Sequence, residues 1–282
     1  MVLIFFFCVS VQAQLLWKIS GKGLTKNSYL FGTHHLIDKD QIPQFDSILA
    51  VCGQTEAVVG EMDLKTPGMQ QKMMQGSVMK GKKMKDLVSA TDYELLDDEF
   101  KSVMGLGMSI LGGLKPMMLM TMHQLTLYLK IMGIKKQPVP VDELFQKQAR
   151  VAKKKIIGLE TLEFQMNALF NSISLERQAE ILLYEVREKE QLMNELKQLN
   201  EVYLAGDLEK MNALDVADES MKPEERRMLI DDRNLNWMRQ LPDLIKQQSC
   251  FVAVGCLHLV GATGLINQLR LNGYSVEPVR FQ

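Results

Sequence analysis

The sequence predicts a mixed α/β fold, in which a central mixed sheet is built from the N- and C-terminal segments around a large helical insertion. Three observations support this prediction. Short apolar runs typical of buried strands occur near both ends, the middle shows apolar residues at helical spacing, and residues 251–279 follow a strand–helix–strand pattern. The 282 residues are enough for one large domain with a sizeable core.

The first 13 residues have the pattern of a secretory signal peptide. Residues 2–7 are wholly apolar, and Val11-Gln12-Ala13 fits a small-residue cleavage site. The apolar run is too short to span a bilayer, and no later segment has the roughly 20 apolar residues that a transmembrane helix needs. We therefore expect export to the periplasm or cell surface of a bacterium, followed by a single domain over residues 14–282. A buried N-terminal strand is the alternative.

The N-terminal part of the mature chain is expected to contribute strands at residues 15–19, 28–31 and 57–62. Each is a short apolar run, and a glycine-rich turn separates the first two. Residues 42–51 show helical spacing, with Pro43 at a first-turn position.

Residues 64–133 and 161–247 are expected to be mainly helical. Thirteen of the 20 methionines lie between Met62 and Met132, where they suit flexible core packing or an adaptable substrate groove. Thr91 to Glu94 fits a capping box, and Pro116 fits the first turn of a helix over 114–132. Further elements are expected as strands at 138–141 and 155–159 and as helices at 143–153, 175–199, 206–214 and 223–246.

The C-terminal part has the clearest pattern. A strand is expected at 251–255, a helix at 264–272 and a last strand at 275–279, with Gly273 as the residue that ends the helix. An apolar run such as 252–254 fits a strand that is covered on both faces of its sheet.

Charge and cysteine content exclude several classes of protein. Lys and Arg total 33 and Asp and Glu total 34, for a net charge of −1, so a general nucleic-acid binder is not expected. Four cysteines do not form a disulfide scaffold in so long a chain. Cys250 and Cys256 would lie about 20 Å apart on an extended strand, too far to bridge. A disulfide between Cys52 and either Cys250 or Cys256 stays open. Alternatively, Cys256 is a free thiol that contacts the functional site.

Two short motifs carry the functional argument. Gly32-Thr33-His34-His35 and Gly255-Cys256-Leu257-His258 share the form Gly-x-x-His, and each follows a predicted strand. Ligand-binding loops of α/β sheets lie at the carboxyl ends of strands, and glycine there lets the chain turn sharply. Glu61 lies at the end of a third such strand.

Two imidazoles and one carboxylate form a standard ligand set for a catalytic divalent metal. We therefore expect His35, His258 and Glu61 to hold a metal ion, with a metal-activated water as the nucleophile. Glu61 is either the third ligand or a general base. The alternatives are buried structural histidines and a surface salt bridge of Glu61.

Further residues are candidates for supporting roles. Adjacent residues of an extended chain point to opposite sides, so only one of His34 and His35 is expected to face the site. Asp63 and Glu160 are candidates to support the ligands, and Glu160 is alternatively a helix-start carboxylate.

Arg233 lies on a predicted helix. It is a candidate to stabilise an oxyanion, and a surface ion pair with Asp231 or Asp232 is the alternative. His123 lies among methionines on another predicted helix and is expected at the helix surface or the edge of the core.

Several blocks of the sequence resemble the signature blocks of the TraB/GumN family. The resemblance covers residues 15–279 in the expected order, and the matching blocks are 29–35, 58–63, 115–116, 158–161, 232–234 and 254–261. It implies metal-binding roles for His35, His258 and Glu61, and a site role for Arg233. It also implies the mixed-sheet fold of the erythromycin-esterase/ChaN-like group. The Tiki members of the family are metal-dependent proteases that use manganese or cobalt. His34 departs from the apolar residue that is common at its position.

These observations predict a secreted or periplasmic metal-dependent hydrolase that acts on a peptide or protein substrate with a bound divalent ion such as Mn, Co or Zn. The alternative is a non-catalytic protein that binds a metal, haem or peptide in the same cleft. An enzyme acting on a non-peptide ester is a third hypothesis, based on fold analogy alone. The chain contains no HExxH, GxSxG or Walker motif.

Overall fold

The computed structural model describes residues 14–281. The expected signal peptide at residues 1–13, which includes Cys8, lies outside the described residues. No helix in the described part of the chain combines the length and the apolar character required to cross a membrane.

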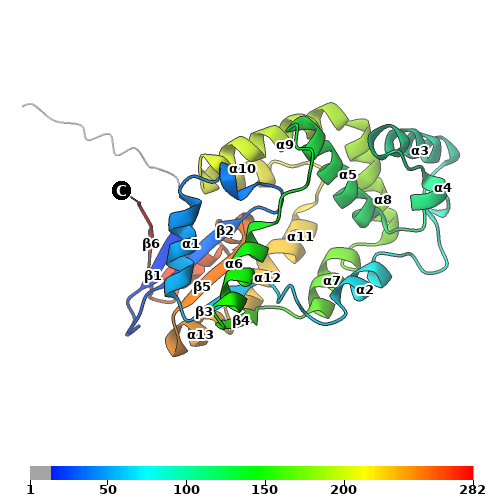
Figure 1. Cartoon of the computed structure of the whole chain (residues 1–282). Helices are drawn as coiled ribbons and strands as arrows, with labels where there is room; N and C mark the ends of the chain where they lie inside the picture. Colours follow the sequence, from blue (N-terminus) through cyan, green and yellow to red (C-terminus); the bar gives the residue numbers. More distant parts are fainter. Residues whose placement is uncertain (1–13, 282) are drawn as a thin grey trace, which may run out of the picture.

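Within residues 14–281, six strands form one mixed sheet in the order β4-β3-β5-β2-β1-β6 (Figure 1). Strands β2, β5, β3 and β4 run parallel to one another, and β1 is antiparallel to both β2 and β6. The predicted mixed α/β class is confirmed. The strands are β1 (Leu16–Ser20), β2 (Ser28–Thr33), β3 (Ala57–Gly60), β4 (Lys155–Gly158), β5 (Cys250–Gly255) and β6 (Ser275–Pro278).

Helices occupy most of the remaining chain. Those of the first half are α1 (Phe45–Gln54), α2 (Met69–Gly76), α3 (Ala90–Met104), α4 (Met108–Leu111), α5 (Pro116–Ile131) and α6 (Val141–Val151). Those of the second half are α7 (Leu162–Phe170), α8 (Leu175–Arg187), α9 (Lys189–Leu204), α10 (Leu208–Val216), α11 (Pro223–Arg226), α12 (Asp232–Trp237), α13 (Leu241–Gln247) and α14 (Leu265–Leu271). A π-helical turn, η3 (Arg227–Asp231), joins α11 to α12, and a 3₁₀ turn, η4 (Cys256–His258), follows β5.

Several boundaries differ from those predicted. The strand expected at 138–141 is absent: Pro138 and Pro140 lack the N–H groups that a ladder needs, and α6 begins at Val141. The long helix expected over 175–199 is two helices that meet at Glu188, whose φ of −98° and ψ of 33° are not helical. The helix expected over 223–246 is interrupted by the π-helical turn and by a break before α13.

The caps show one error and two confirmed predictions. Ser89, not Thr91, caps α3, because its side chain accepts from the Asp92 backbone N–H. Pro116 opens α5 as predicted. Gly273 follows α14 with a φ of +85°, the left-handed conformation that glycine adopts most easily.

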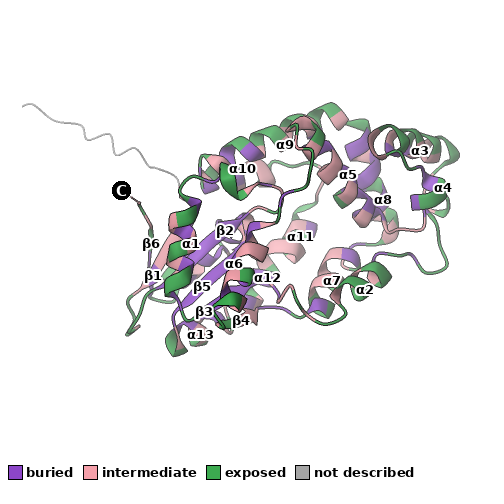
Figure 2. Ribbon diagram, in the orientation of Figure 1, coloured by how far each residue is buried: buried purple, intermediate pink, exposed green. Residues whose placement is uncertain are grey.

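Two separate groups of buried apolar side chains hold the molecule together. The sheet core lies between the strands and their covering helices, and Figure 2 shows the central strands β2, β3 and β5 as its most continuously buried part. The helical core lies among α3, α4, α5 and α8, at the other end of the molecule in Figure 1. The largest sheet-core residues include Phe31, Phe145, Trp237 and Phe251, and fully buried helical-core residues include Met84, Leu96, Phe100, Leu119 and Leu182.

The chain passes between these two cores more than once. It leaves the sheet after β3 to build α2 to α5, returns with α6 and β4, and leaves again for α7 and α8. Helix α6 packs directly against β3, β4 and β5, where Phe145 contacts Phe31 and Phe251 with ring centroids 5.2 and 4.7 Å apart. The helical part is therefore formed by two excursions from the sheet.

Candidate functional site

The parallel strands bring their carboxyl ends to one edge of the sheet. Thr33, Gly60, Gly158 and Gly255 end β2, β3, β4 and β5, and registers pair Thr33 with Gly255 and Gly60 with Gly158. The segments that continue from these ends carry His35, Glu61, Glu160 and His258. Residues that lie more than 190 positions apart in the sequence therefore meet at this edge.

A cavity of about 1020 Å³ opens over this edge. Its walls come from the strand ends, from the segment 62–71, from α5 and from the start of α6. His35 and Glu61 both line it, whereas His258 is 3% exposed and lies beneath its surface. The site therefore has an open layer and a buried layer.

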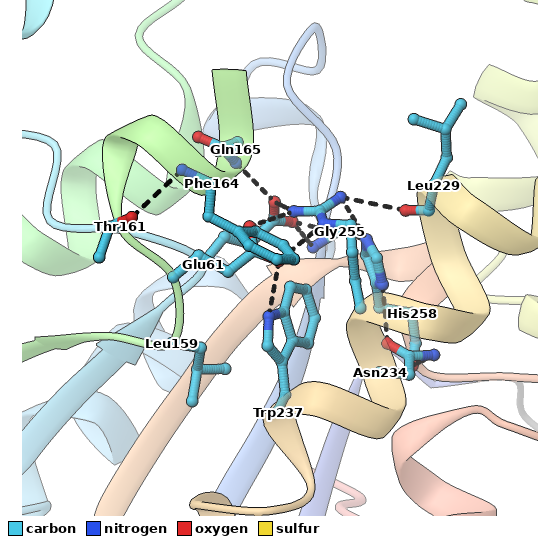
Figure 3. A network of polar contacts seen from close by, with 12 residues as sticks. Glu61, Leu159, Thr161, Phe164, Gln165, Leu229, Asn234, Trp237, Gly255 and His258 are labelled. Atoms are coloured by element: carbon cyan, nitrogen blue, oxygen red, sulfur yellow. Dashed lines mark hydrogen bonds and ion pairs between the residues drawn. The ribbon is translucent and has the colours of Figure 1, made fainter. Parts of the chain in front are cut away.

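Arg233 is the centre of the buried layer. Figure 3 shows the surrounding network of polar contacts, with Glu61, Trp237 and His258 labelled. Its Nε and Nη2 atoms donate to the two carboxylate oxygens of Glu160 at 2.8 and 3.0 Å. Nη2 also donates to Glu61 Oε2 at 2.6 Å. The guanidinium is 5.0 Å from the ring of Trp237, whose Nε1 donates to Glu160 Oε1 at 2.9 Å. The surface ion pair of Arg233 with Asp231 or Asp232 is excluded, because the residue is buried at 5% exposure.

The π-helical turn before α12 contributes to the position of Arg233. Leu229, within this turn, accepts from Arg233 Nη1 through its carbonyl oxygen at 3.2 Å. Interruptions of this kind occur often at functional sites.

Glu61 connects the buried layer to the cavity. Its Oε1 accepts from the Gly255 backbone N–H at 3.0 Å, and its Oε2 accepts from Gln165 Nε2 at 3.1 Å as well as from Arg233. Burial alone would raise the pKa of Glu61, but the charges of His258 in its protonated form, of Arg233 and of His35 lower that pKa to about 2. Glu61 is therefore a carboxylate at neutral pH.

His258 is oriented by Asn234. The ring Nδ1 is 2.7 Å from Asn234 Oδ1, while Asn234 Nδ2 donates to the His258 carbonyl oxygen at 3.2 Å. This pair of contacts assigns the proton to Nδ1 and leaves the lone pair on Nε2. Burial lowers the pKa of His258 to about 4, so the ring is neutral. Nε2 then accepts from Arg233 Nη1 at 3.2 Å and lies 4.0 Å from Glu61 Oε1.

The glycines of the two Gly-x-x-His motifs permit close approach rather than a sharp turn. Gly32 belongs to β2, and a Cβ added there would lie 3.0 Å from Cys256 Cβ. Gly255 has an ordinary φ of −49°, and a Cβ there would lie 3.3 Å from Glu61 Oε1. Gly32 therefore lets the first motif pack against the second, and Gly255 leaves room for the Glu61 carboxylate.

His35 belongs to the open layer. Its side chain is 61% exposed in the cavity wall, and Nδ1 is 3.2 Å from Asp142 Oδ2. The hydrogen bond with Asp142 raises the pKa of His35 to about 9 against the opposing desolvation by the surrounding cavity walls, so His35 is protonated at neutral pH. His34 turns away, with its ring 5.2 Å from that of Tyr203, and burial lowers its pKa to about 4.

Three other candidates lie outside this arrangement. Asp63 forms an ion pair with Arg150 and accepts from the Lys65 backbone N–H, so it does not support Glu61. Cys256 places Sγ 3.3 Å from Met211 Sδ in the sheet core and does not reach the cavity. His123 is fully buried and has Nε2 2.9 Å from Glu99 Oε1, so of its two expected positions, the helix surface and the edge of the core, the helix surface is excluded.

The cysteines of the described chain are not paired. Cys52, Cys250 and Cys256 are buried free thiols, and burial raises the pKa of each to about 12.

Four residues with clear positions in the site were missed by sequence reasoning. Asn234 and Trp237 lie one and four positions after Arg233, and this helical spacing is a signal that could have grouped Trp237 with Arg233. Asp142 and Gln165 have no such signal, because they come from helices α6 and α7 far along the chain.

The donor groups fit a divalent cation in part. Glu61 Oε1 and the unprotonated Nε2 of His258 are 4.0 Å apart, a spacing that two ligands of one ion can have. Two carboxylates share the single guanidinium of Arg233, which leaves one net negative charge when His258 is neutral. Among residues 14–281, no three His, Cys, Asp or Glu side chains are grouped closely enough to hold an ion as they stand. A third ligand therefore has to come from His35 or from outside the chain.

Comparison with known proteins identifies the family. No curated protein and no solved structure matches the chain. The sequence profile of the TraB/PrgY/gumN family matches residues 15–278, which is nearly the whole chain. The match contains every residue of the open and buried layers. The chain therefore belongs to the TraB/PrgY/gumN family.

Proposed function

We propose that the chain is a metal-dependent hydrolase that cleaves peptide bonds in the cavity above the sheet edge. The observation that carries this proposal is the pair formed by Glu61 and His258: an ionised carboxylate and a neutral imidazole whose unprotonated Nε2, which accepts from Arg233 Nη1, lies 4.0 Å from Glu61 Oε1. This is the protonation state in which both groups bind metals. The excess negative charge around Arg233 favours a bound cation in the same place.

Glu61 and His258 would hold the ion, and His35 would complete the protein ligands from the cavity wall. A bound divalent ion would supply Lewis acidity and lower the pKa of a water molecule. Asn234 would act through His258 by keeping its proton on Nδ1. His35 has to lose its proton to become a ligand, so metal uptake should release a proton and strengthen as the pH rises toward 9.

The other residues have roles that follow from their contacts. Arg233 holds Glu61 in position and presents a fixed positive charge that would stabilise a developing oxyanion. Glu61, with a pKa of about 2, is too weak a base to take a proton efficiently near neutral pH. Of the two roles proposed for Glu61, the ligand role is therefore favoured.

The cavity suits a peptide in size and lining. Its volume of about 1020 Å³ is at the upper end of the range for small-molecule sites. The amide side chains of Gln70, Gln71 and Gln137 line it beside Leu36 and Leu125. Amides can pair with the backbone of an extended peptide, and the leucines can contact its side chains.

Metal analysis combined with a peptide-cleavage screen tests this function. The purified chain is loaded separately with Mn²⁺, Co²⁺ and Zn²⁺, and bound metal and cleavage of a fluorogenic peptide library are measured. We expect about one ion per chain, and we expect His258→Ala and His35→Ala to lower cleavage by about 100-fold or more. His34→Ala is the matched control and should retain both activities. Full cleavage by the His35→Ala, His258→Ala double variant would refute the proposal.

A binding protein without turnover is the second candidate. It is favoured by the contacts that Glu61 and His258 already make, since Arg233 engages Glu61 Oε2 and His258 Nε2 together. Metal or peptide binding without cleavage under any of the three ions would support this candidate over the hydrolase.

We also propose that residues 1–13 act as a signal peptide and that the enzyme works in the periplasm or at the cell surface. The support is the apolar run with its small-residue cleavage site. N-terminal sequencing of the exported protein should begin at Gln14. Recovery of the uncleaved chain in the cytoplasm would contradict this localisation.

A further inference from the structure

A second, smaller cavity lies next to the main one, among helices α5, α8 and α9. Its volume is about 200 Å³. Gln124, on α5, lines both cavities, so a single side chain forms part of the wall that they share. In Figure 1 these three helices lie together in the helical part.

The lining of the second cavity is acidic. Glu185, Glu188, Glu195 and Asp218 contribute to it, and no lysine or arginine does. None of these four carboxylates has an ion-pair partner within residues 14–281. Acidic side chains alone are common on surfaces, so the position of Glu185 decides the argument.

Glu185 is buried at 6% exposure, yet only one of its two carboxyl oxygens has a hydrogen-bond partner. Oε1 accepts from Gln124 Nε2 at 2.6 Å, and the buried Oε2 has no hydrogen-bond partner. A buried polar atom without a partner destabilises the folded state by about 1–3 kcal/mol. Glu185 belongs to the lining of the cavity while Oε2 itself is buried, so its carboxyl group has to turn toward a cation in that cavity for Oε2 to gain the missing partner.

The apolar part of the lining indicates the shape of that cation. Leu192, Leu196 and Leu199 line the cavity together with the carboxylates. This combination suits a charged head on an aliphatic stem.

We propose that the second cavity is a specificity subsite that accepts the ammonium group of a lysine side chain of the peptide substrate. The proposal rests on the peptide substrate of the proposed function. The lysine stem would pass Gln124 and contact the leucines, and the ammonium group would donate to Glu185 Oε2, with Glu195 and Asp218 contributing negative charge.

The electrostatics of Glu185 agree with this assignment. Burial, with a contribution from the charges of Asp218 and Glu195, raises the pKa of Glu185 to about 8. Glu185 is therefore largely protonated at pH 7 when no cation is present. A bound ammonium group would favour the carboxylate, so binding should release a proton.

Binding of two blocked pentapeptides tests the subsite. Both are alanine peptides, one with a central lysine and the other with norleucine, and their affinities for the full chain are measured by calorimetry. We expect the lysine peptide to bind at least about 10-fold more tightly. Glu185→Gln should remove the difference, while Glu190→Gln, an exposed control on α9 outside the cavity, should keep it. If Glu185→Gln does not fold, Asp218→Asn, at an exposed position, should reduce the preference instead.

The outcomes separate the subsite from the proposed hydrolysis. A lysine preference that depends on Glu185, without cleavage of either peptide, would support the subsite and count against the hydrolase. Cleavage of both peptides with equal kcat/KM would support the hydrolase and overturn the subsite. Equal affinities, absence of measurable binding, or a preference retained in Glu185→Gln would each overturn the subsite.

Discussion

Two buried carboxyl groups, Glu160 at the sheet edge and Glu185 in the helical part, have opposite surroundings. At the sheet edge, Arg233 donates to both Glu61 and Glu160, so each buried carboxylate has a charged partner. In the helical part, Glu185 Oε2 and His123 Nδ1 are buried without partners among the described residues. The pKa values follow this difference: that of Glu61 falls to about 2, and that of Glu185 rises to about 8.

The difference indicates how the two regions serve a site. A complete network fixes the positions of its members and keeps their charge states constant over a wide pH range. An incomplete network responds to pH or to an added cation, because a proton or a bound cation compensates the buried charge that has no partner in the chain. The sheet edge is thus suited to hold reacting groups, and the cavity beside Glu185 is suited to recognise a charge.

Breaking the sheet-edge network should have the largest effect. Arg233→Ala leaves the buried Glu160 and the partly buried Glu61 without their shared cation, and we expect it to lower the free energy of unfolding by about 3–5 kcal/mol. Urea denaturation measures this change. Arg227→Ala, which removes an exposed pair with Asp232 at 3.9 Å, should change stability by less than about 1 kcal/mol. Similar losses in both variants would show that the network is no stronger than a surface ion pair.

Removing the titration of Glu185 should change how stability depends on pH. The pKa of Glu185 is about 8 in the folded state and 4.5 as its ordinary value, so the unfolded chain releases this proton first as pH rises. Stability is therefore fully present below about pH 4.5 and decreases toward pH 8, by up to about 1.4 kcal/mol per pH unit.

In Glu185→Gln this decrease should be absent. Urea denaturation of both proteins at pH 5, 6.5 and 8 measures the effect, and the variant should gain stability relative to the wild type as the pH increases. Parallel pH profiles of the two proteins would mean that Glu185 is not held protonated in the folded state. Glu190→Gln, on the exposed side of α9, should leave the wild-type profile unchanged.

The positioning of His258 by Asn234 can be tested through metal affinity. Asn234→Ala removes the acceptor of the Nδ1 proton, so the lone pair is no longer fixed on Nε2. We expect metal affinity to fall by about 10- to 100-fold, as measured by calorimetry with Mn²⁺ or Co²⁺. Asn236→Ala, on the same helix, should bind normally, and thermal melting should verify that both variants are folded. An unchanged affinity in Asn234→Ala would argue against His258 as a ligand.

The sequence contained enough information for the sheet and for the convergence at its edge. The apolar runs predict the strands, and parallel strands all have their carboxyl ends at the same edge of the sheet. Glu61 and His258 each follow such a strand, so their proximity could be predicted from the sequence. The pairing of His35 with Asp142 could not be found in this way, because it depends on how α6 packs against the sheet. The same holds for Glu185, whose burial depends on the packing of α8 against α5 and α9.

Helix boundaries were harder to predict than strands, and the start of α3 gives the smallest of the four tests. Both Ser89 and Thr91 are exposed residues that can cap a helix, and only the Ser89 hydroxyl accepts from the Asp92 backbone N–H, at 3.1 Å. Ser89→Ala should therefore lower the free energy of unfolding by about 1 kcal/mol, and Thr91→Ala by less than about 0.5 kcal/mol. Urea denaturation at constant pH measures both. If Thr91→Ala lowered the free energy of unfolding more than Ser89→Ala, Thr91 and not Ser89 would be the N-cap, and α3 would begin two residues later.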